Sequence, residues 1–285
     1  MPGLKRTRTT SSNDSWIVDQ AAAKSKRAGM SPAVRAKRSY TQRALTAKVK
    51  KIVTSMAEKK HATFNHNAEQ VASYSSTGWS NQVVPLTPMS TFASIAQGVS
   101  QDERIGNKIR TQKATFRAIM YPTAYNATSN TNPKPQSVRF VVFSMKGDQN
   151  LVPSTLDSFF QNGSSSHPPN GDLGDMIDVI NTDLYTVYKD FTTKIGFSSF
   201  DQPATGSAAN LGYYANNDYP LNQVVKIDAT KACPAVINFN DNSTVPEGRA
   251  VFVTWFAAPC DGSVDTAATI RARMNYSVDF SYTDE

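Results

Sequence analysis

The clearest pattern along the chain is a strict alternation of apolar and polar side chains near the C-terminus. From Ile270 to Tyr282 every second residue is apolar, and polar residues such as Arg273 and Asp279 occupy the positions between them. Side chains of a β-strand point alternately to its two faces, so this period of two indicates a strand with one buried face. We therefore predict a long strand over residues 270–282.

Further strand patterns fill the chain from residue 107 onward, and Pro, Gly and Asn clusters divide them. A short helix is predicted at 153–161, because Pro153 suits a first helical turn and Leu156, Phe159 and Phe160 share one face, and a Gly/Ser/Pro loop is predicted at 162–174. The other predicted strands are 107–121, 137–146, 183–190, 191–197, 222–229, 235–240 and 249–258.

Eight strands of uneven length with almost no helix favour an all-β fold. Few of the connections resemble tight hairpins, so we expect an eight-stranded antiparallel jelly-roll sandwich. An immunoglobulin-type domain is disfavoured because its Cys…Trp…Cys spacing is missing.

The first hundred residues show a different pattern. Residues 1–40 hold few large apolar side chains and are expected to be disordered. Within 41–60, apolar residues recur at helical spacing among lysines, which fits either a basic amphipathic helix or a partly ordered linker. We expect 61–97 to be mostly irregular, with one or two short strands around Val83–Leu86.

The net charge changes sign near residue 60. Residues 1–60 hold 15 Lys and Arg against Asp14, Asp19 and Glu58, a net charge of +12, while residues 61–285 carry a net charge of −5. We predict a basic N-terminal arm, disordered or partly helical, over 1–60 and a single jelly-roll domain over 61–285.

The charge of the arm is the strongest functional signal in the sequence. Many flexible cations bind phosphates without reading sequence, because the affinity comes from counterion release. The clusters KSKR (24–27) and RAKR (35–38) also fit nuclear import, and a solubilising tail is the plainer alternative. The predicted nucleic-acid contacts in the arm are Lys5, Arg6, Arg8, Lys24, Lys26, Arg27, Arg35, Lys37, Arg38, Arg43, Lys48, Lys50, Lys51, Lys59 and Lys60.

Few features of the sequence support a catalytic function. The three histidines, His61, His66 and His167, match no metal or catalytic motif and are expected in loops, so we predict no enzyme, no cofactor and no metal. The weak candidates for calcium are Asp172, Asp175 and Asp178, which would need ligands from other chains. Cys233 and Cys260 are expected to be structural thiols. No apolar run reaches the length of a membrane-spanning helix.

Residues 93–121 carry a motif shared with a known group of proteins. The chain has Ile95, Gln97 and Gly98, then Arg104-Ile105-Gly106-x-Lys108-Ile109. This pattern resembles the capsid proteins of small circular, replication-initiator-encoding single-stranded DNA viruses, the circovirus-like group, in which it precedes the first long strand of a jelly roll. The glycines are expected to allow turns and Arg104 to anchor the segment through polar contacts.

The resemblance implies an icosahedral shell built from copies of this chain, on the order of 60, located in the virion and assembled in the host nucleus or cytoplasm. The packaged partner would be single-stranded nucleic acid, most simply DNA; the receptor on the host cell is not identified. Lys108, Arg110, Lys113 and Arg117 would line a strand facing the genome. The alternatives are the coat protein of a small positive-strand RNA virus and a non-viral nucleic-acid-binding β-sandwich.

Overall fold

A computed structural model describes most of the predicted body and one short piece of the arm. The described residues are 44–49, 58–71, 83–89, 94–100, 102–124, 130, 133–147, 156–197, 219–265 and 269–284. The chain forms two units, Met1–Ala57 and Glu58–Glu285, and each is treated by itself. In the first unit, residues 44–49 are helical, in line with the helical spacing of that segment.

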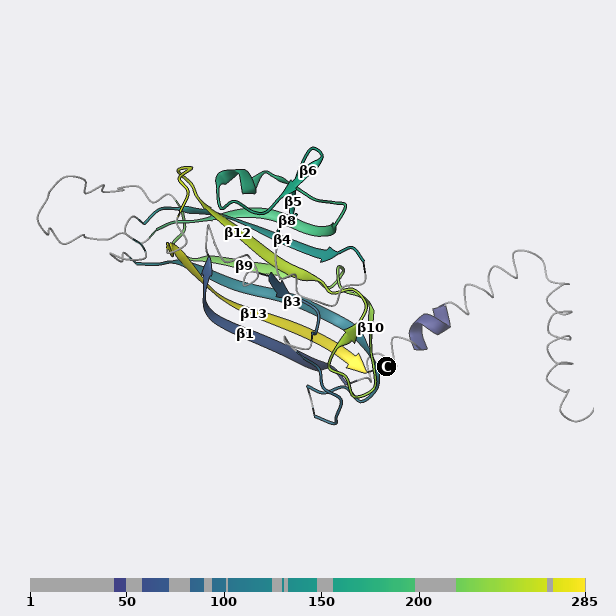
Figure 1. The fold of residues 1–285 in the computed structure, drawn as a ribbon. Helices are drawn as coiled ribbons and strands as arrows, with labels where there is room; N and C mark the ends of the chain where they lie inside the picture. The colour runs from purple at the N-terminus through teal and green to yellow at the C-terminus, as the bar shows by residue number, and fades with distance from the viewer. Residues whose placement is uncertain are drawn as a thin grey trace, which may run out of the picture. The chain divides into compact units, whose positions relative to one another are not determined.

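The second unit is all-β, as predicted (Figure 1). Its described residues form thirteen strands, so the predicted count of eight is not exact. The elements are β1 (Lys60–Val71), β2 (Val83–Pro85), β3 (Lys108–Pro122), β4 (Gln136–Met145), β5 (Phe160–Asn162), β6 (Ser165–His167), the 3-10 helix η3 (Leu173–Met176), β7 (Val179–Ile180), β8 (Tyr185–Ile195), β9 (Gln223–Asp228), β10 (Val236–Phe239), β11 (Pro246–Glu247), β12 (Phe252–Pro259) and β13 (Ala272–Asp284).

The order of the strands is that of a jelly roll. One sheet runs β1-β13-β3, and β9 and β10 pair in succession along the far edge of β3; the other sheet runs β2-β12-β4-β8. When β9 and β10 count as one position, the sheets read 1-8-3-6 and 2-7-4-5 in chain order. All strand pairings are antiparallel. In a jelly roll, four antiparallel strand pairs of one long hairpin are folded over so that their strands divide between two sheets, which gives this order.

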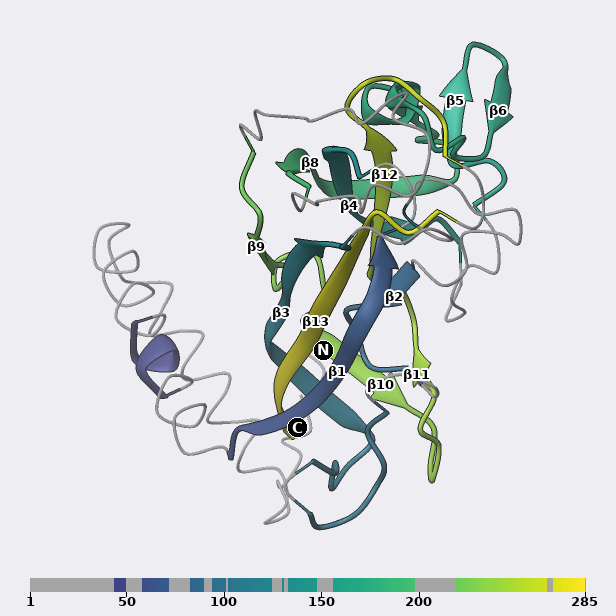
Figure 2. The same cartoon turned by 90° about the vertical axis from the view of Figure 1, so that its left-hand side faces the viewer.

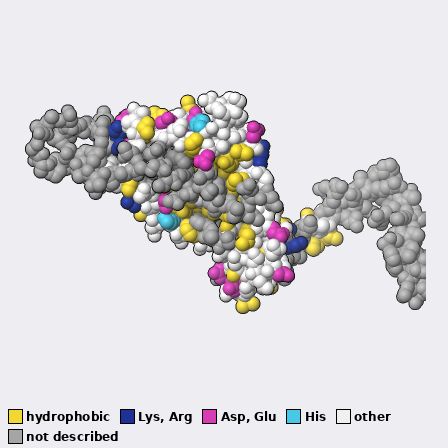
Figure 3. All heavy atoms as spheres, viewed as in Figure 1, with side chains coloured by type: hydrophobic (Ala, Val, Ile, Leu, Met, Phe, Trp, Pro, Cys, Tyr) yellow, Lys and Arg dark blue, Asp and Glu magenta, His cyan; other side chains and the backbone are white. Residues whose placement is uncertain are grey.

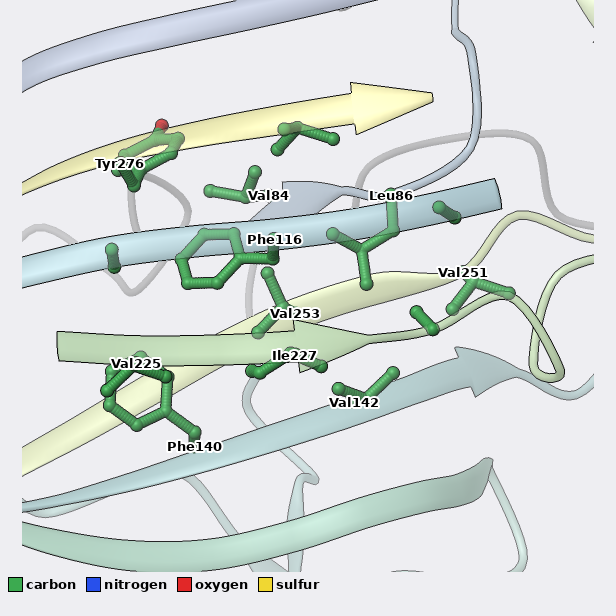
Figure 4. Close-up of a cluster of buried hydrophobic side chains, with 14 of the residues drawn as sticks. Val84, Leu86, Phe116, Phe140, Val142, Val225, Ile227, Val251, Val253 and Tyr276 are labelled. Atoms are coloured by element: carbon green, nitrogen blue, oxygen red, sulfur yellow. The ribbon is translucent and has the colours of Figure 1, made fainter. Parts of the chain in front are cut away.

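The main core lies between these two sheets. Phe116 of β3 packs near Phe140 of β4 with 6.3 Å between ring centroids, and Trp255 of β12 lies 5.8 Å from Tyr276 of β13. Figure 4 shows such side chains converging from strands of both sheets. The predicted inward set of the last strand, which includes Met274, Val278 and Phe280, is fully or almost fully buried there.

The two sheets differ in what covers their outer faces. The β1-β13-β3-β9 sheet alternates between buried and exposed residues, whereas every residue of β12 and all but the last of β4 are buried. Residues 156–184 explain the difference, because Phe159, Phe160 and Ile180 pack with Phe143 and Phe256 on the second face of β4 and β12. A strand covered on both faces has no need of polar alternation.

The segment that forms this cover was predicted incorrectly. Within the described part of the predicted helix 153–161, Leu156–Phe159 is a turn and Phe160 begins β5. The predicted loop 162–174 contains β6, which pairs with β5 as a hairpin (Figure 2). Arg139 of β4 fixes the cover by donating to both carboxylate oxygens of Asp190 and to the backbone oxygens of Asp175 and Asp178.

Two further predictions of strand boundaries were wrong. Residues 60–71 form β1, an edge strand paired along its length with β13, although 61–97 was expected to be mostly irregular. Consequently 107–121 is the third strand of the jelly roll rather than the first long one. The predicted strands 183–190 and 191–197 are one continuous strand, β8, paired with β4.

Candidate nucleic-acid interface

The outer face of the β1-β13-β3-β9 sheet is the side of the sandwich that no element among the described residues covers. Its outward positions are exposed or half-buried, apart from a few such as Thr115. The predicted genome-facing residues Lys108, Arg110, Lys113 and Arg117 all lie on β3 and are all exposed.

A β-bulge brings these four cations to one face. Lys108 and Arg110 have even numbers and Lys113 and Arg117 odd ones, so a regular strand would point the pairs in opposite directions. The register against β13 shifts at Gln112: Thr111 faces Tyr282, whereas Lys113 faces Ser281. The extra residue reverses the alternation, so Ile109 and Ala114 both point into the core and the four cations point outward.

Two neighbouring rungs of this face enclose a shallow depression of about 350 Å³. In the first rung, Asn65, Ser277, Arg117 and Lys226 follow one another across β1, β13, β3 and β9. In the second, Asn275, Ile119 and Val224 do the same across β13, β3 and β9. Apart from Lys226, these residues line the depression together with Asn67, Ala118 and Tyr276.

The carboxylates of Asp228 and Asp279 on this face have partners other than Arg117. Asp228 accepts hydrogen bonds from the hydroxyl and backbone N–H of Thr230, which lower its pKa, and Lys113 and Lys226 lower it further. Asp279 lies 3.1 Å from Nδ1 of His61. Arg117, by contrast, has no carboxylate within ion-pair distance in the described part of the chain.

On the face shown in Figure 3, acidic and basic side chains are scattered among uncharged ones. This distribution matches the net charge of −5 over residues 61–285. The net positive charge of the chain therefore comes from residues 1–60.

The two halves of the motif at 95–109 lie against each other. Gly98 donates its backbone N–H to the oxygen of Arg104, and Arg104 donates its own to the oxygen of Ala96. The Glu103 carboxylate lies against Gly98, so a side chain at this position would displace it. Ile95 and Ile109 are completely buried. The motif therefore builds the loop that leads into β3.

Arg104 anchors this loop as expected. Its guanidinium is fully buried, donates to the backbone oxygens of Gly106, Asn240 and Ser243 and to the side chain of Asn107, and lies 4.5 Å from the Phe239 ring centroid. Buried in this way, Arg104 is a structural residue that joins the loop before β3 to the turn after β10.

Lys60 also occupies a structural position. It is 2% exposed, pairs with Asp284 at 2.9 Å and donates to the backbone oxygen of Glu103 at 2.7 Å. Its ammonium group is thus used within the protein. Lys48 and Lys59 are exposed. The remaining predicted contacts of the arm lie outside the described residues: Lys5, Arg6, Arg8, Lys24, Lys26, Arg27, Arg35, Lys37, Arg38, Arg43, Lys50 and Lys51.

Two of the three aspartates considered for calcium accept hydrogen bonds within the chain. Oxygens of Asp175 accept hydrogen bonds from the backbone N–H groups of Asn170 and Gly171, and Asp172 caps η3 through the N–H of Gly174. In the described ranges no group of three or more His, Cys, Asp and Glu side chains is placed to hold a metal ion.

The histidines and cysteines have structural surroundings. His61 and His66 lie on β1 and not in the expected loop, and His66 pairs with Glu69 at 2.7 Å and stacks on Tyr276. Cys233 is buried, which raises its pKa to about 12, and Cys260 is half-buried. A thiol with so high a pKa is a poor nucleophile.

Several residues of the depression could not be identified from the sequence. Asn65 and Asn67 were missed because β1 was not recognised. Lys226, which lies beside the depression as the partner of Arg117, was not linked to the β3 row. The alternation over 270–282 did place Asn275 and Ser277 on the outward face.

Comparisons with known proteins give no family for this chain: no protein-family model matches it, and neither does any curated protein. No helix within the described ranges has the length and apolar character needed to span a membrane.

Proposed function

We propose that this chain is a viral capsid protein that assembles into an icosahedral shell and packages single-stranded nucleic acid, most simply DNA, through its basic arm. The observation that carries the proposal is the combination of a jelly roll with a net charge of +12 over residues 1–60, of which only Lys60 belongs to its first strand. The function is assembly, and no catalytic role is assigned to any residue.

In this proposal, the net charges give the arm and the body different roles. A body of net charge −5 has little capacity of its own to hold a polyanion, whereas arms of +12 from on the order of 60 copies supply about 720 positive charges. Binding of nucleic acid relieves repulsion between arms, so packaging and shell closure are thermodynamically linked.

Neutralising the two basic clusters of the arm tests this role. Replacing the six cations of 24–27 and 35–38 by Gln halves the formal charge of the arm and should lower the nucleic-acid content of purified particles by about half. The measurement is the ratio of nucleic acid to protein in particles isolated on a density gradient. The substituted residues are Lys24, Lys26, Arg27, Arg35, Lys37 and Arg38.

A matched control carries six substitutions to Gln at uncharged positions of the same segment and should package normally. Unchanged nucleic-acid content in the neutralised variant would show that the arm does not package. Digestion of the extracted nucleic acid with DNase and with RNase then assigns the chemistry of the genome. The control positions are Ala21, Ala22, Ala23, Ser25, Ala28 and Ala36.

A further inference from the structure

We infer that the depression on the outer face of the β1-β13-β3-β9 sheet binds one unpaired nucleotide of the packaged strand, with the base over Ile119 and Val224 and the phosphate at Arg117. This inference rests on the proposed function and extends it, because it adds a contact of the folded body with the bases to the phosphate binding of the arm.

The floor of the depression is suited to the flat face of a base. Ile119 is 40% exposed and Val224 is 68% exposed, and they are direct partners across β3 and β9. Two such side chains together on an otherwise polar sheet face leave apolar surface in water, and covering it is favourable. Every nucleobase offers an apolar face of this kind whatever its identity.

The rim supplies polar groups for the edge of the base. Asn65, Asn67 and Asn275 line the depression beside the apolar pair. Asn275 already accepts the backbone N–H of Ala68 at 2.7 Å through its side-chain oxygen, so its amide nitrogen is the group left to donate. Amides both donate and accept, which fits base edges without demanding one base.

The adjoining rung supplies the charge. Arg117 and Lys226 are cross-strand partners and both are exposed. The two rungs are about 7 Å apart, since each residue of a strand advances about 3.4 Å. That separation is comparable to the distance from a base to its phosphate. A guanidinium without a carboxylate partner is free to bind a phosphate through two parallel hydrogen bonds.

A nucleotide matches the depression better than another protein element does. It combines an apolar base, a polar base edge and a phosphate, and the depression offers apolar, amide and cationic groups within about 350 Å³. The opposite face of the sandwich is covered by residues 156–184 of the same chain.

The test uses the full-length protein and two fluorescein-labelled oligonucleotides of equal charge. One is an oligothymidylate of about ten nucleotides, and the other is its abasic analogue with the same number of phosphates. Binding is measured by fluorescence anisotropy at low salt and at about 0.5 M NaCl, where phosphate contacts of the arm are weakened. We expect the abasic oligonucleotide to bind about fivefold more weakly at high salt.

Two variants locate the effect. Ile119→Glu and Arg117→Gln should each weaken binding of the oligothymidylate at high salt by about fivefold, and Ile119→Glu should remove the preference over the abasic analogue. The controls are Val236→Glu, an exposed apolar residue of the same sheet, and Lys231→Gln, an exposed cation in the turn after β9. Thermal unfolding confirms that each variant is folded.

The outcomes separate the two proposals. Equal binding of both oligonucleotides by the wild-type protein, or variants that bind like their controls, would overturn the nucleotide site and leave packaging by the arm intact. Failure of the wild-type protein to bind either oligonucleotide even at low salt would overturn the proposed function together with the site.

Discussion

Arg104 shows how one buried cation can hold together segments that are far apart in the sequence. Its guanidinium reaches backbone oxygens of Gly106, Asn240 and Ser243, and its face covers the Phe239 ring. Ile95 and Ile109 of the motif are fully buried, and the backbone N–H of Gly98 donates to the oxygen of Arg104. At the residue scale, burial and hydrogen bonding explain these four positions of the motif.

Replacing Arg104 by Met should therefore destabilise the body. The backbone oxygens that it satisfies would be left buried without partners, so we expect the free energy of unfolding to fall by about 3 kcal/mol. Urea unfolding followed by intrinsic fluorescence measures this loss. Lys108→Met, an exposed residue four positions further on, should change the stability by less than about 0.5 kcal/mol. Equal stabilities for the two variants would contradict the anchoring role.

Asp175 predicts a dependence of stability on pH. Its pKa is raised to about 6, chiefly by burial; backbone N–H bonds from Asn170 and Gly171 lower the pKa, and the nearby Asp172 and Asp178 raise it. A carboxyl group with a raised native pKa binds its proton more tightly in the folded state. Its contribution is therefore greatest below about pH 4 and is lost as the pH rises through about 6.

Comparison with Asp175→Asn isolates this contribution. The difference in unfolding free energy, wild type minus variant, should decrease as the pH is raised from about 4 to about 7, because the Asn side chain does not ionise. Thermal or urea unfolding at several pH values measures this difference. A difference that stays constant over the range, or that increases, would show that Asp175 ionises as readily in the folded as in the unfolded chain.

At the element scale, the strands that the sequence pattern predicted and those that it missed differ in their inward residues. The strand β13 buries an unbroken apolar set, and β3, β4 and β12 are equally rich in apolar residues. In β1 the inward positions include Lys60 and His66, whose polar groups are satisfied by Asp284 and Glu69. Such partners come from the tertiary fold, and hydropathy along one segment cannot reveal them.

The remaining errors have similar causes. The sequence pattern predicted two strands that meet after Asp190, whereas β8 continues through this residue. Asp190 can lie within the strand because Arg139 of the neighbouring strand pairs with it. The bulge at Gln112 is visible only through the register with β13. The depression was unpredictable for the same reason, since it combines residues of four strands, one of them unrecognised.

The bulge in β1 holds Ala68 in a strained backbone conformation. Ala68 has a φ of 58°, in the left-handed region that residues with a Cβ rarely adopt, where the register with β13 shifts between His66 and Glu69. Ala68→Gly should raise the free energy of unfolding by about 0.5–1 kcal/mol. The thermal midpoint measures the change. In the same strand, Ala62→Gly should be destabilising, because Ala62 is buried in regular strand; stabilisation by both variants would contradict the account.

At the scale of the whole molecule, the chain divides into two parts of opposite net charge. The net charge of +7 is the sum of a +12 arm and a −5 body, and the body is a jelly roll in which residues 156–184 cover one outer face and no described element covers the other. We propose that the arm supplies affinity for phosphates, and that the bare face adds contacts with the bases. In this proposal, copies of the body meet one another to form the shell.

Sedimentation velocity of the purified full-length protein, recorded at two ultraviolet wavelengths that distinguish nucleic acid from protein, tests this claim most directly. The account predicts a discrete, fast-sedimenting particle in which both signals move together, and loss of that particle when high salt weakens the phosphate contacts of the arm. A protein that sediments only as a monomer or dimer at every salt concentration, with and without added single-stranded nucleic acid, would contradict it.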